Sequence, residues 1–450
     1  MAKKLWGGRF SKKTDPFVEE FTKSIQYDYK LAKYDLIGSQ IHVQVLKNGG
    51  YLASNEAVKI KKALSRIYKS IEDGSFKPSK ESEDIHTNIQ NLLQEKVGNL
   101  ALKLHTARSR NDQVVFAAKL YCKEAIFDSC DHIVCLAKEI ANLAKKNSGV
   151  IIPGFTHLQH AQPVLLTDYL EAYEDMLIRD ANRLQSIAGN IKVVMGAGAL
   201  AGTPINSGEY KIKTAGMVKE LGKIGINFVE AIDNSLDTVS DRDFVIEIIS
   251  ALSIVAMHLS RLAEDLIIWS TKEFDFIEID EAFCTGSSLM PQKKNADVLE
   301  LIRGYAGRLY GNLVSVLTMM KGLPLTYNRD MQLDKEPLFN SFEIVSSELK
   351  VLSGLIKTLK FNKANIAEHL KDEGLYATDI VYYLVGKKVP FKEAHTIVGK
   401  LVKYSLENEI QIKDMPESLL KKFSNKFVKK EIVKLFDPLV SVKSKKSIKR

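Results

Sequence analysis

The run from Asn111 to Lys146 constrains the fold most, because it continues for roughly ten helical turns without a proline or a glycine. Its apolar residues recur at helical spacing. Helices longer than about 25 residues are unusual in compact domains and are typical of long bundles. Further helical patterns begin after Pro163, Asp241, Asp297 and Asp334. The sequence therefore predicts an all-α protein built around a central bundle of long helices.

The length of the chain predicts more than one domain. At 450 residues it exceeds the roughly 250 to 300 residues that one hydrophobic core supports. Residues 1–107 contain short patterns and loops, which predict a mostly helical N-terminal domain. Residues 108–364 predict the central bundle, and residues 365–450 predict a small helical domain that ends in a basic tail. We therefore expect three domains.

Composition and charge narrow the class of protein. Apolar residues at 45% and charged residues at 26% are globular averages, which exclude disordered and collagen-like chains. The net charge is +9, and residues 421–450 contain eleven Lys or Arg against Glu431 and Asp437, so this segment carries the whole excess. The basic tail, residues 441–450, could touch nucleic acid or an anionic membrane. No aromatic residue is interleaved there, so we favour a solvated terminus and expect neither partner.

Neither a membrane span nor a secretory signal is expected. The most apolar run, from Phe244 to Leu259, includes Glu247 and is short for a span of about 20 residues. A helix buried in the bundle explains it better. The N-terminus is basic but lacks the apolar core of a secretory signal, so we expect a cytoplasmic protein. The four cysteines form no C-x-x-C pair, and we interpret them as reduced thiols.

Polar clusters rich in Gly, Ser, Asn and His interrupt the apolar pattern at or near expected helix ends, where unpaired N–H groups can bind anions. Several have simple structural interpretations. Asn111 or Asp112 fits a helix cap, and His157 fits a loop histidine after a Pro-Gly turn. Glu300 fits a capping box that begins at Asp297. The clusters are residues 82–89, 105–112, 153–163, 234–243 and 283–297.

The last of these clusters, "FCTGSSLMPQKKNAD", is too polar for a core and too irregular for a helix. Its glycine supplies a hinge, and Pro291 stiffens the middle. Lys293 and Lys294 would ordinarily be solvated surface charges. A mobile loop that brings hydroxyl, ammonium and amide groups together is suited to closing over an anionic substrate.

This cluster resembles the signature loop of the superfamily that contains fumarase, aspartase and argininosuccinate lyase, whose pattern is approximately G-S-S-x-M-P-x-K-x-N. The segments "LWGGRF", "TARSRNDQV", "PGFTHLQHAQP", "GAGALAGTP" and "NSLDTVSDRDF" are similar to those of argininosuccinate lyases in particular. The resemblance covers nearly the whole chain and weakens toward the C-terminus. Three residues depart from the family's usual choice, and none removes a group that the chemistry needs: Ala296 in place of Pro, His160 in place of a basic residue and Gln90 in place of Glu.

The resemblance implies reversible elimination of argininosuccinate to arginine and fumarate, without a metal or an organic cofactor. Proton removal beside a carboxylate creates a dianion, and preorganised donors stabilise such developing charge. By resemblance, Ser287 is the base. A serine hydroxyl is a poor base at neutral pH, so this role requires a positive, N–H-rich loop around the oxygen. Lys293 and Asn295 would hold the dianion.

The resemblance also implies a proton donor and a set of substrate-binding residues. His157 would protonate the leaving nitrogen, directly or through water, with Glu300 as its orienting partner. Four subunits of such enzymes pair their long helices in a shared core, and each active site draws on three of them. We therefore expect a homotetramer. The residues expected to bind substrate are Arg110, Asn111, Thr156, Tyr327, Gln332 and Lys335, with His86 and Arg242 as weaker candidates.

Two alternatives remain open at this point. Another fumarate-releasing lyase of the same fold, such as adenylosuccinate lyase, is disfavoured by Gln292 and Lys294 in the loop. A non-catalytic structural relative, like the eye-lens crystallins, is disfavoured because the residues implied in the chemistry are intact.

Overall fold

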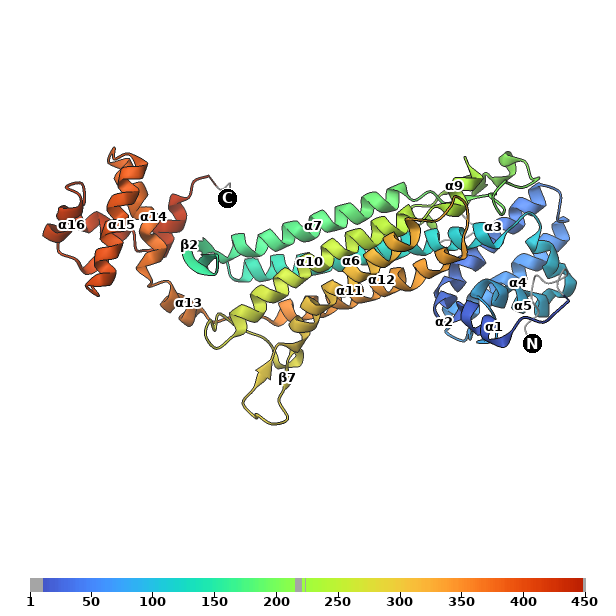
Figure 1. The fold of residues 1–450 in the computed structure, drawn as a ribbon, viewed down its shortest axis with the longest axis horizontal. Coiled ribbons are helices and arrows are strands. Elements are labelled where there is room, and N and C mark those ends of the chain that lie inside the picture. Colours follow the sequence, from blue (N-terminus) through green and yellow to red (C-terminus); the bar gives the residue numbers. More distant parts are fainter. Residues whose placement is uncertain (1–10, 215–220, 223, 448–450) are drawn as a thin grey trace. The chain divides into compact units, whose positions relative to one another are not determined.

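The computed structural model describes residues 11–214, 221–222 and 224–447, and most of them lie in helices (Figure 1). The "LWGGRF" segment, residues 5–10, lies outside the described residues. The prediction of an all-α protein with long helices is confirmed. Each of the five long helices begins within three residues of its expected start: α6 (Arg110–Lys146), α7 (Leu166–Asn190), α10 (Asp243–Ser270), α11 (Asp297–Met320) and α12 (Lys335–Thr358).

A reciprocal cap explains where α6 begins. The hydroxyl of Ser109 accepts the backbone N–H of Asn111 at 3.2 Å, and the carboxylate of Asp112 accepts the backbone N–H of Ser109 at 3.0 Å. This is the capping-box arrangement, with Asp in the position usually held by Glu. The expectation that Asn111 or Asp112 caps the helix was therefore wrong in detail. Ser109 is the cap, and Asp112 completes the box from inside the helix.

The chain divides into two compact units. The first contains residues 1–133, 179–257 and 305–347, and the second contains residues 134–178, 258–304 and 348–450. Each long helix contributes residues to both units. The division into three domains at residues 107 and 364 stays a prediction.

The first unit contains the short N-terminal helices, and α3 packs against α4 and α5. Leu36, Ile41 and Leu46 of α3 are fully buried, as are Ile60 and Leu64 of α4, so these two helices form much of its core. The N-terminal elements are α1 (Pro16–Thr22), α2 (Ile25–Asp28), η1 (Tyr29–Leu31), α3 (Ala32–Asn48), α4 (Ser54–Glu72), α5 (Ile85–Val97) and η2 (Gly98–His105).

A small sheet and several short segments complete the first unit. The sheet has the order β3-β5-β4, in which β3 is parallel and β4 antiparallel to β5. The elements are β3 (Val194–Met195), η3 (Ser207–Tyr210), β4 (Ile212–Lys213), β5 (Phe228–Ala231), α9 (Ser235–Ser240) and η5 (Arg329–Asp334).

The second unit holds three two-stranded sheets that the helical pattern did not predict. The segment 153–163 lies just before α7, near a helix end as expected, but it forms part of an antiparallel hairpin whose strands are six and seven residues long. The pairs are β1 (Ile151–Thr156) with β2 (Gln159–Leu165), β6 (Ile277–Glu278) with β9 (Lys360–Phe361), and β7 (Thr285–Gly286) with β8 (Lys294–Asn295); η4 (Glu281–Phe283) precedes β7.

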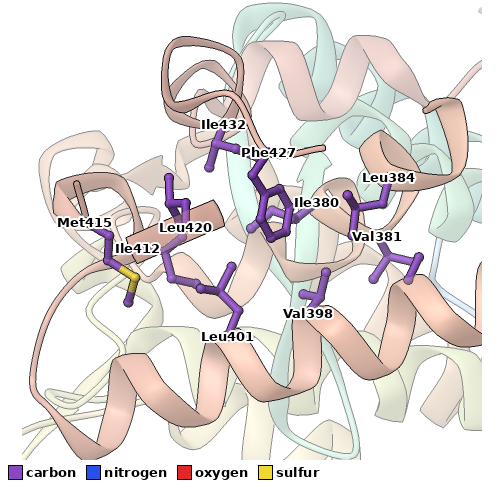
Figure 2. Packing of buried hydrophobic residues seen from close by; sticks show 11 residues of the cluster. Ile380, Val381, Leu384, Val398, Leu401, Ile412, Met415, Leu420, Phe427 and Ile432 are labelled. Atoms are coloured by element: carbon purple, nitrogen blue, oxygen red, sulfur yellow. The ribbon is translucent and has the colours of Figure 1, made fainter. Parts of the chain in front are cut away.

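The C-terminal helices of the second unit have their own apolar core. Figure 2 shows Ile380, Leu384, Val398, Leu401 and Phe427 packed together, and all five are almost completely buried. The prediction of a helical C-terminal segment is consistent with this packing. The elements are α13 (Lys363–His369), η6 (Glu373–Tyr376), α14 (Ala377–Gly386), α15 (Phe391–Glu407), η7 (Ile412–Asp414), α16 (Glu417–Phe423), α17 (Lys429–Lys434) and α18 (Pro438–Ser444).

The beginning of the basic tail is folded rather than solvated. Ser441 and Val442 of α18 are buried. The carboxylate of Asp379 accepts the Ser441 hydroxyl and the Lys445 ammonium, each at 2.5 Å. The interpretation of residues 441–450 as a solvated terminus was therefore wrong up to Lys445, because a buried carboxylate holds this part on α14. Residues 448–450 lie outside the described residues.

Helix α10 is long and apolar enough, by length and composition, to cross a membrane. Of its most apolar window, 56% is buried within the chain. The helix therefore already packs against other segments, as expected for a bundle helix, and leaves part of its apolar surface uncovered.

Glu348 on α12 generates a prediction about stability. It is buried, and within the described chain neither carboxyl oxygen has a hydrogen-bond partner. Burial raises the pKa of Glu348 from 4.5 to about 8. The folded state therefore holds a proton that the unfolded state releases, so stability falls as pH rises from about 5 to 8. We expect Glu348→Gln to remove this loss. The melting temperature of the variant minus that of the parent should therefore increase as pH rises across that range.

The matched control is Glu343→Gln on the same helix, where the carboxylate is exposed and paired with Lys30. Its melting temperature should run parallel to that of the parent at every pH. Parallel curves for Glu348→Gln as well would contradict the prediction.

Candidate active site

The signature loop connects the two strands of a short hairpin. Thr285 pairs with Asn295, and Gly286 pairs with Lys294. In Figure 1 the connecting segment extends away from the helix that follows it. The Thr285 hydroxyl donates to the carboxylate of Asp297, which is the first residue of α11. The capping-box interpretation of Asp297 was therefore wrong, because this residue lies inside the helix and its side chain closes the base of the loop.

Ser287 begins the segment between these strands and is half-buried. Its Oγ accepts the backbone N–H of Leu289 at 3.2 Å and that of Met290 at 3.0 Å. Two N–H donors directed at one oxygen stabilise negative charge on it. The backbone thus supplies the N–H-rich surroundings that an alkoxide at Ser287 would need.

The two adjacent lysines of the loop have different surroundings. Lys294 lies in β8, and its ammonium donates to the backbone carbonyl of Ile279 at 2.5 Å. Lys293 lies before the strand and is exposed. Lys294 is therefore occupied in holding the base of the loop, whereas the ammonium of Lys293 is available to a ligand. Asn295, in β8 with Lys294, is half-buried.

His157 lies at the tip of the β1–β2 hairpin, with Thr156 beside it, and both are exposed. The two turn residues, His157 and Leu158, have φ values of 55° and 58°. Positive φ at both positions is the type I′ pattern, which normally selects Asn-Gly and strains other residues. The Pro-Gly turn expected before His157 was wrong, because Pro153 and Gly154 lie inside β1.

Glu300 lies in the first turn of α11 and is exposed. In the described chain no hydrogen bond joins it to His157, although both belong to the second unit. A pocket of about 700 Å³ in this unit is lined by residues of β2, α7, α10 and α18, and it includes none of the predicted site residues. The single chain therefore presents these groups on exposed surfaces rather than in a closed site.

In the first unit, Asp334 holds two of the predicted binding residues. Its carboxylate accepts hydrogen bonds from the Arg242 guanidinium and, at 2.7 Å, from the Lys335 ammonium. All three side chains are at least nine-tenths buried. Two cations can stay buried here only because they share this counter-charge.

Arg110 is held in a similar way by Asp84. Its Nε lies 2.9 Å from the Asp84 carboxylate, and its terminal nitrogens donate to Gln113 at 2.5 Å and to Thr87 at 2.9 Å. Each terminal nitrogen carries two N–H groups, so one on each remains for a substrate carboxylate. Asp84 also caps α5 through the backbone N–H of Thr87, which fixes the carboxylate in place.

His86 belongs to a buried network around Asp35. The His86 Nδ1 lies 2.9 Å from the Asp35 carboxylate, which also accepts the Gln113 amide at 2.6 Å. Arg108 lies 3.5 Å from the same carboxylate. Burial alone would raise the pKa of Asp35, but His86 and Arg108 outweigh it and hold the pKa at about 2. Gln113 therefore links Arg110 to the carboxylate that holds His86.

Tyr327 and Gln332 lie close to these networks. Burial raises the pKa of Tyr327, and the charges of Arg329 and Arg242 oppose the rise. Gln332 donates to the backbone carbonyl of Thr22 at 3.3 Å. The first unit thus holds four of the predicted binding residues on carboxylates that are buried or nearly so: Arg110, His86, Arg242 and Lys335.

Asn111 is directed to a glycine-rich loop. Its amide donates to the carbonyl of Ala199 at 3.2 Å, and the neighbouring Asp112 carboxylate accepts the N–H of Gly198 at 2.9 Å. Gly198 has a φ of 58°, and a Cβ there would lie 2.6 Å from the carbonyl oxygen of Gly202. Only glycine allows this approach, which explains the "GAGALAGTP" motif at this place.

Sequence reasoning missed the counter-charges that organise the site. Asp35, Asp84 and Asp334 were not singled out, although each holds a predicted binding residue. The only available signal was local: Asp84 precedes His86 in a polar cluster, and Asp334 directly precedes Lys335. Asp35 gave no such signal, because it contacts His86 from a different helix.

Comparisons with known proteins show which families the chain is similar to. Residues 8–311 match the family described as Lyase, and residues 374–443 match the argininosuccinate lyase C-terminal family. The chain is 44% identical to an argininosuccinate lyase of Caldanaerobacter subterraneus, over 99% of this chain and 98% of that protein. It is 48% identical to one from Clostridium kluyveri, over 94% of each.

Solved structures share the fold at low sequence identity. An EDDS lyase in complex with formate has a TM-score of 0.77 at 23% identity, covering 95% of this chain and 85% of that one. A class II fumarase from Schistosoma mansoni has a TM-score of 0.77 at 16% identity, covering 91% and 90%. These similarities support the bundle fold.

The buried Asp334 group generates a second prediction. Asp334→Asn leaves Arg242 and Lys335 buried without their counter-charge, so the free energy of unfolding should fall by about 3–5 kcal/mol. Denaturant titration would measure this loss. The control is Asp233→Asn. It removes an exposed ion pair in which the Asp233 carboxylate lies 3.7 Å from the Lys192 ammonium, and it should change stability by less than about 1 kcal/mol. Equal effects of the two substitutions would contradict the assignment.

Proposed function

The chain belongs to the argininosuccinate lyase family, and from this premise we propose how its own residues carry out the reaction. The enzyme is a carbon–nitrogen lyase that cleaves argininosuccinate reversibly to arginine and fumarate, a step of arginine biosynthesis. The elimination removes a proton from the carbon beside a carboxylate, breaks the bond from the neighbouring carbon to nitrogen, and delivers a proton to the leaving nitrogen. The chain must therefore supply a base, a site for the dianion and an acid.

Ser287 is the proposed base, and the pair of backbone N–H groups at its Oγ is the observation that carries this assignment. A serine alkoxide is unfavourable at neutral pH unless nearby donors and positive charge stabilise it. The N–H groups of Leu289 and Met290 supply the donors. Lys293, in the same loop, supplies the charge.

Lys293 and Asn295 are the proposed holders of the dianion. The choice of Lys293 over Lys294 is supported by the contact of Lys294 with the Ile279 carbonyl, which occupies that ammonium. An ammonium and an amide two residues apart can both donate to one carboxylate as its charge grows.

His157 is the proposed acid, and Glu300 its orienting partner. The exposed position of His157 at a hairpin tip suits a group that reaches a substrate outside its own fold. Because His157 and Glu300 form no hydrogen bond within the described chain, we propose that their partnership forms between subunits.

The first unit supplies the proposed substrate-binding groups except Thr156, which lies on the β1–β2 hairpin of the second unit. Arg110 retains free N–H groups for a carboxylate, and Arg guanidinium groups bind carboxylates with two parallel hydrogen bonds. Asn111 and Thr156 would contribute further contacts to the fumarate portion. The other proposed contacts to the substrate are Tyr327, Gln332 and Lys335, with His86 and Arg242 as weaker candidates.

A homotetramer with shared active sites completes the proposal. Helix α11 leaves large apolar side chains exposed, and the apolar α10 is only partly covered. Such surfaces need further burial, and pairing with copies of the same chain would provide it. The proposed location is the cytoplasm. The exposed apolar residues of α11 are Leu301, Tyr305, Tyr310, Val314 and Leu317.

A substrate panel tests the activity. Purified protein is offered argininosuccinate and adenylosuccinate separately, while fumarate and the second product are followed. Arginine should appear only with argininosuccinate. Fumarate release from adenylosuccinate, or no turnover of either substrate, would contradict the proposal.

Two substitutions test the loop assignments. Ser287→Ala should lower kcat by at least about 100-fold with the oligomer intact, since base catalysis contributes about 10²–10⁴-fold. Lys293→Met should lower kcat by about 100-fold or more, as expected for loss of one charge-stabilising donor. The matched substitution Lys294→Met should lower kcat less, because it should act only through the stability of the loop. The reverse order for the two lysines would overturn the assignment.

A further inference from the structure

The hairpin that carries His157 is attached to the C-terminal helices by one polar contact. The Nδ1 of His160 lies 2.6 Å from one carboxylate oxygen of Asp372. The other oxygen accepts the backbone N–H of Gly374 at 2.9 Å and so caps η6. In the described chain this is the only side-chain hydrogen bond between residues 155–160 and another element. Asp372 therefore links the end of β2 directly to η6.

Aromatic packing holds the His160 ring in place. Its centroid lies 5.0 Å from that of Phe155, its cross-strand neighbour, and 6.0 Å from that of His369 in an edge-on arrangement. His369 in turn lies edge-on at 5.0 Å to Phe276, which is 1% exposed. The ring is thus fixed between the hairpin and α13, with its Nδ1 directed to Asp372.

The hairpin itself is irregular where this contact is made. Gly154 pairs with Gln162 but Phe155 pairs with His160, so Ala161 is an extra residue in β2. Such a bulge bends the strand and redirects the residues beyond it. A Cβ at Gly154 would lie 2.7 Å from the carbonyl oxygen of Gln162, so glycine is required for the strands to approach. The tip beyond the bulge needs a separate support.

The strained turn at the tip of the hairpin also requires support from outside the hairpin. His157 and Leu158 both have positive φ, and non-glycine residues held in this region cost about 1–3 kcal/mol each. Such strain persists only where the surrounding structure holds the backbone in place. The His160 contact lies three residues from His157, at the start of β2 just beyond the turn.

We propose that His160 is a positioning residue, which together with Asp372 holds the hairpin tip so that His157 delivers its proton to the leaving nitrogen. The inference rests on the proposed role of His157 as the acid. It assigns His160 no contact with substrate. Because an arginine at this position could donate to the same carboxylate, His160→Arg is the conservative variant.

Kinetics of four variants test the proposal. His160→Ala and Asp372→Asn should each lower kcat by about 10- to 100-fold, since a displacement of about 1 Å in a reacting group has effects of that size. The KM should change little. The double variant should be no worse than either single one, because the two residues form one contact. His160→Arg should restore most of the kcat.

Lys371→Ala is the matched control. Lys371 is adjacent to Asp372 and forms an exposed pair with Glu368 rather than with a residue of the hairpin. Its kcat should equal that of the parent. If His160→Ala lowers the melting temperature but leaves kcat per folded enzyme unchanged, the residue is merely structural and the proposal is overturned.

The same substitution in a His157→Ala variant distinguishes failure of this proposal from failure of the proposed function on which it rests. If His157→Ala retains the parent's kcat, the assignment of the acid fails, and the positioning role fails with it. If His157→Ala is impaired, adding His160→Ala should lower its residual kcat no further. An equal fold-loss in both backgrounds would mean that His160 does not act through His157, and it would overturn the positioning role alone.

Discussion

The structure depends on long helices, of which the most apolar, α10, must be covered on nearly every side. An uninterrupted helix such as α6 is continuous over many turns, so it can serve both compact units at once. The same property leaves apolar surface uncovered in a single chain: α10 is only partly buried, and α11 exposes Leu301 and Val314. The proposed assembly of four chains follows from this constraint, since other long helices are well suited to cover such surfaces.

The candidate chemistry is distributed over the fold in two different ways. The first unit pairs Arg242 and Lys335 with the buried Asp334 and Arg110 with the partly buried Asp84, so these cations are held before any substrate binds. The second unit places Ser287 and His157 in connections between short strands, where the backbone can adopt conformations that a helix forbids. The proposed binding groups are thus held by ion pairs, while the proposed base and acid lie on exposed hairpins that other subunits can meet.

The hairpins also show how backbone geometry prepares a side chain. The Ser287 hydroxyl meets two N–H groups because the chain turns sharply within three residues. His157 is carried on a strained turn whose support comes from elsewhere, through the bulge at Ala161 and the contact between His160 and Asp372. In both places the local conformation needs support from neighbouring elements, because an isolated two-stranded hairpin has little stability of its own.

The sequence by itself determined the long helices and the chemistry of the family. Apolar periodicity placed the five long helices within a few residues, and in α6 a run without proline also predicted the length, because these signals are local. The loop motif likewise identified Ser287, Lys293 and Asn295 as candidates. Only the tertiary structure decided the hairpins, the contact of Lys294 with Ile279, and the carboxylates that hold the binding residues. Asp35 meets His86, and Asp372 meets His160, across long separations along the chain. Such pairs are set by how helices and strands pack, and no local pattern encodes them.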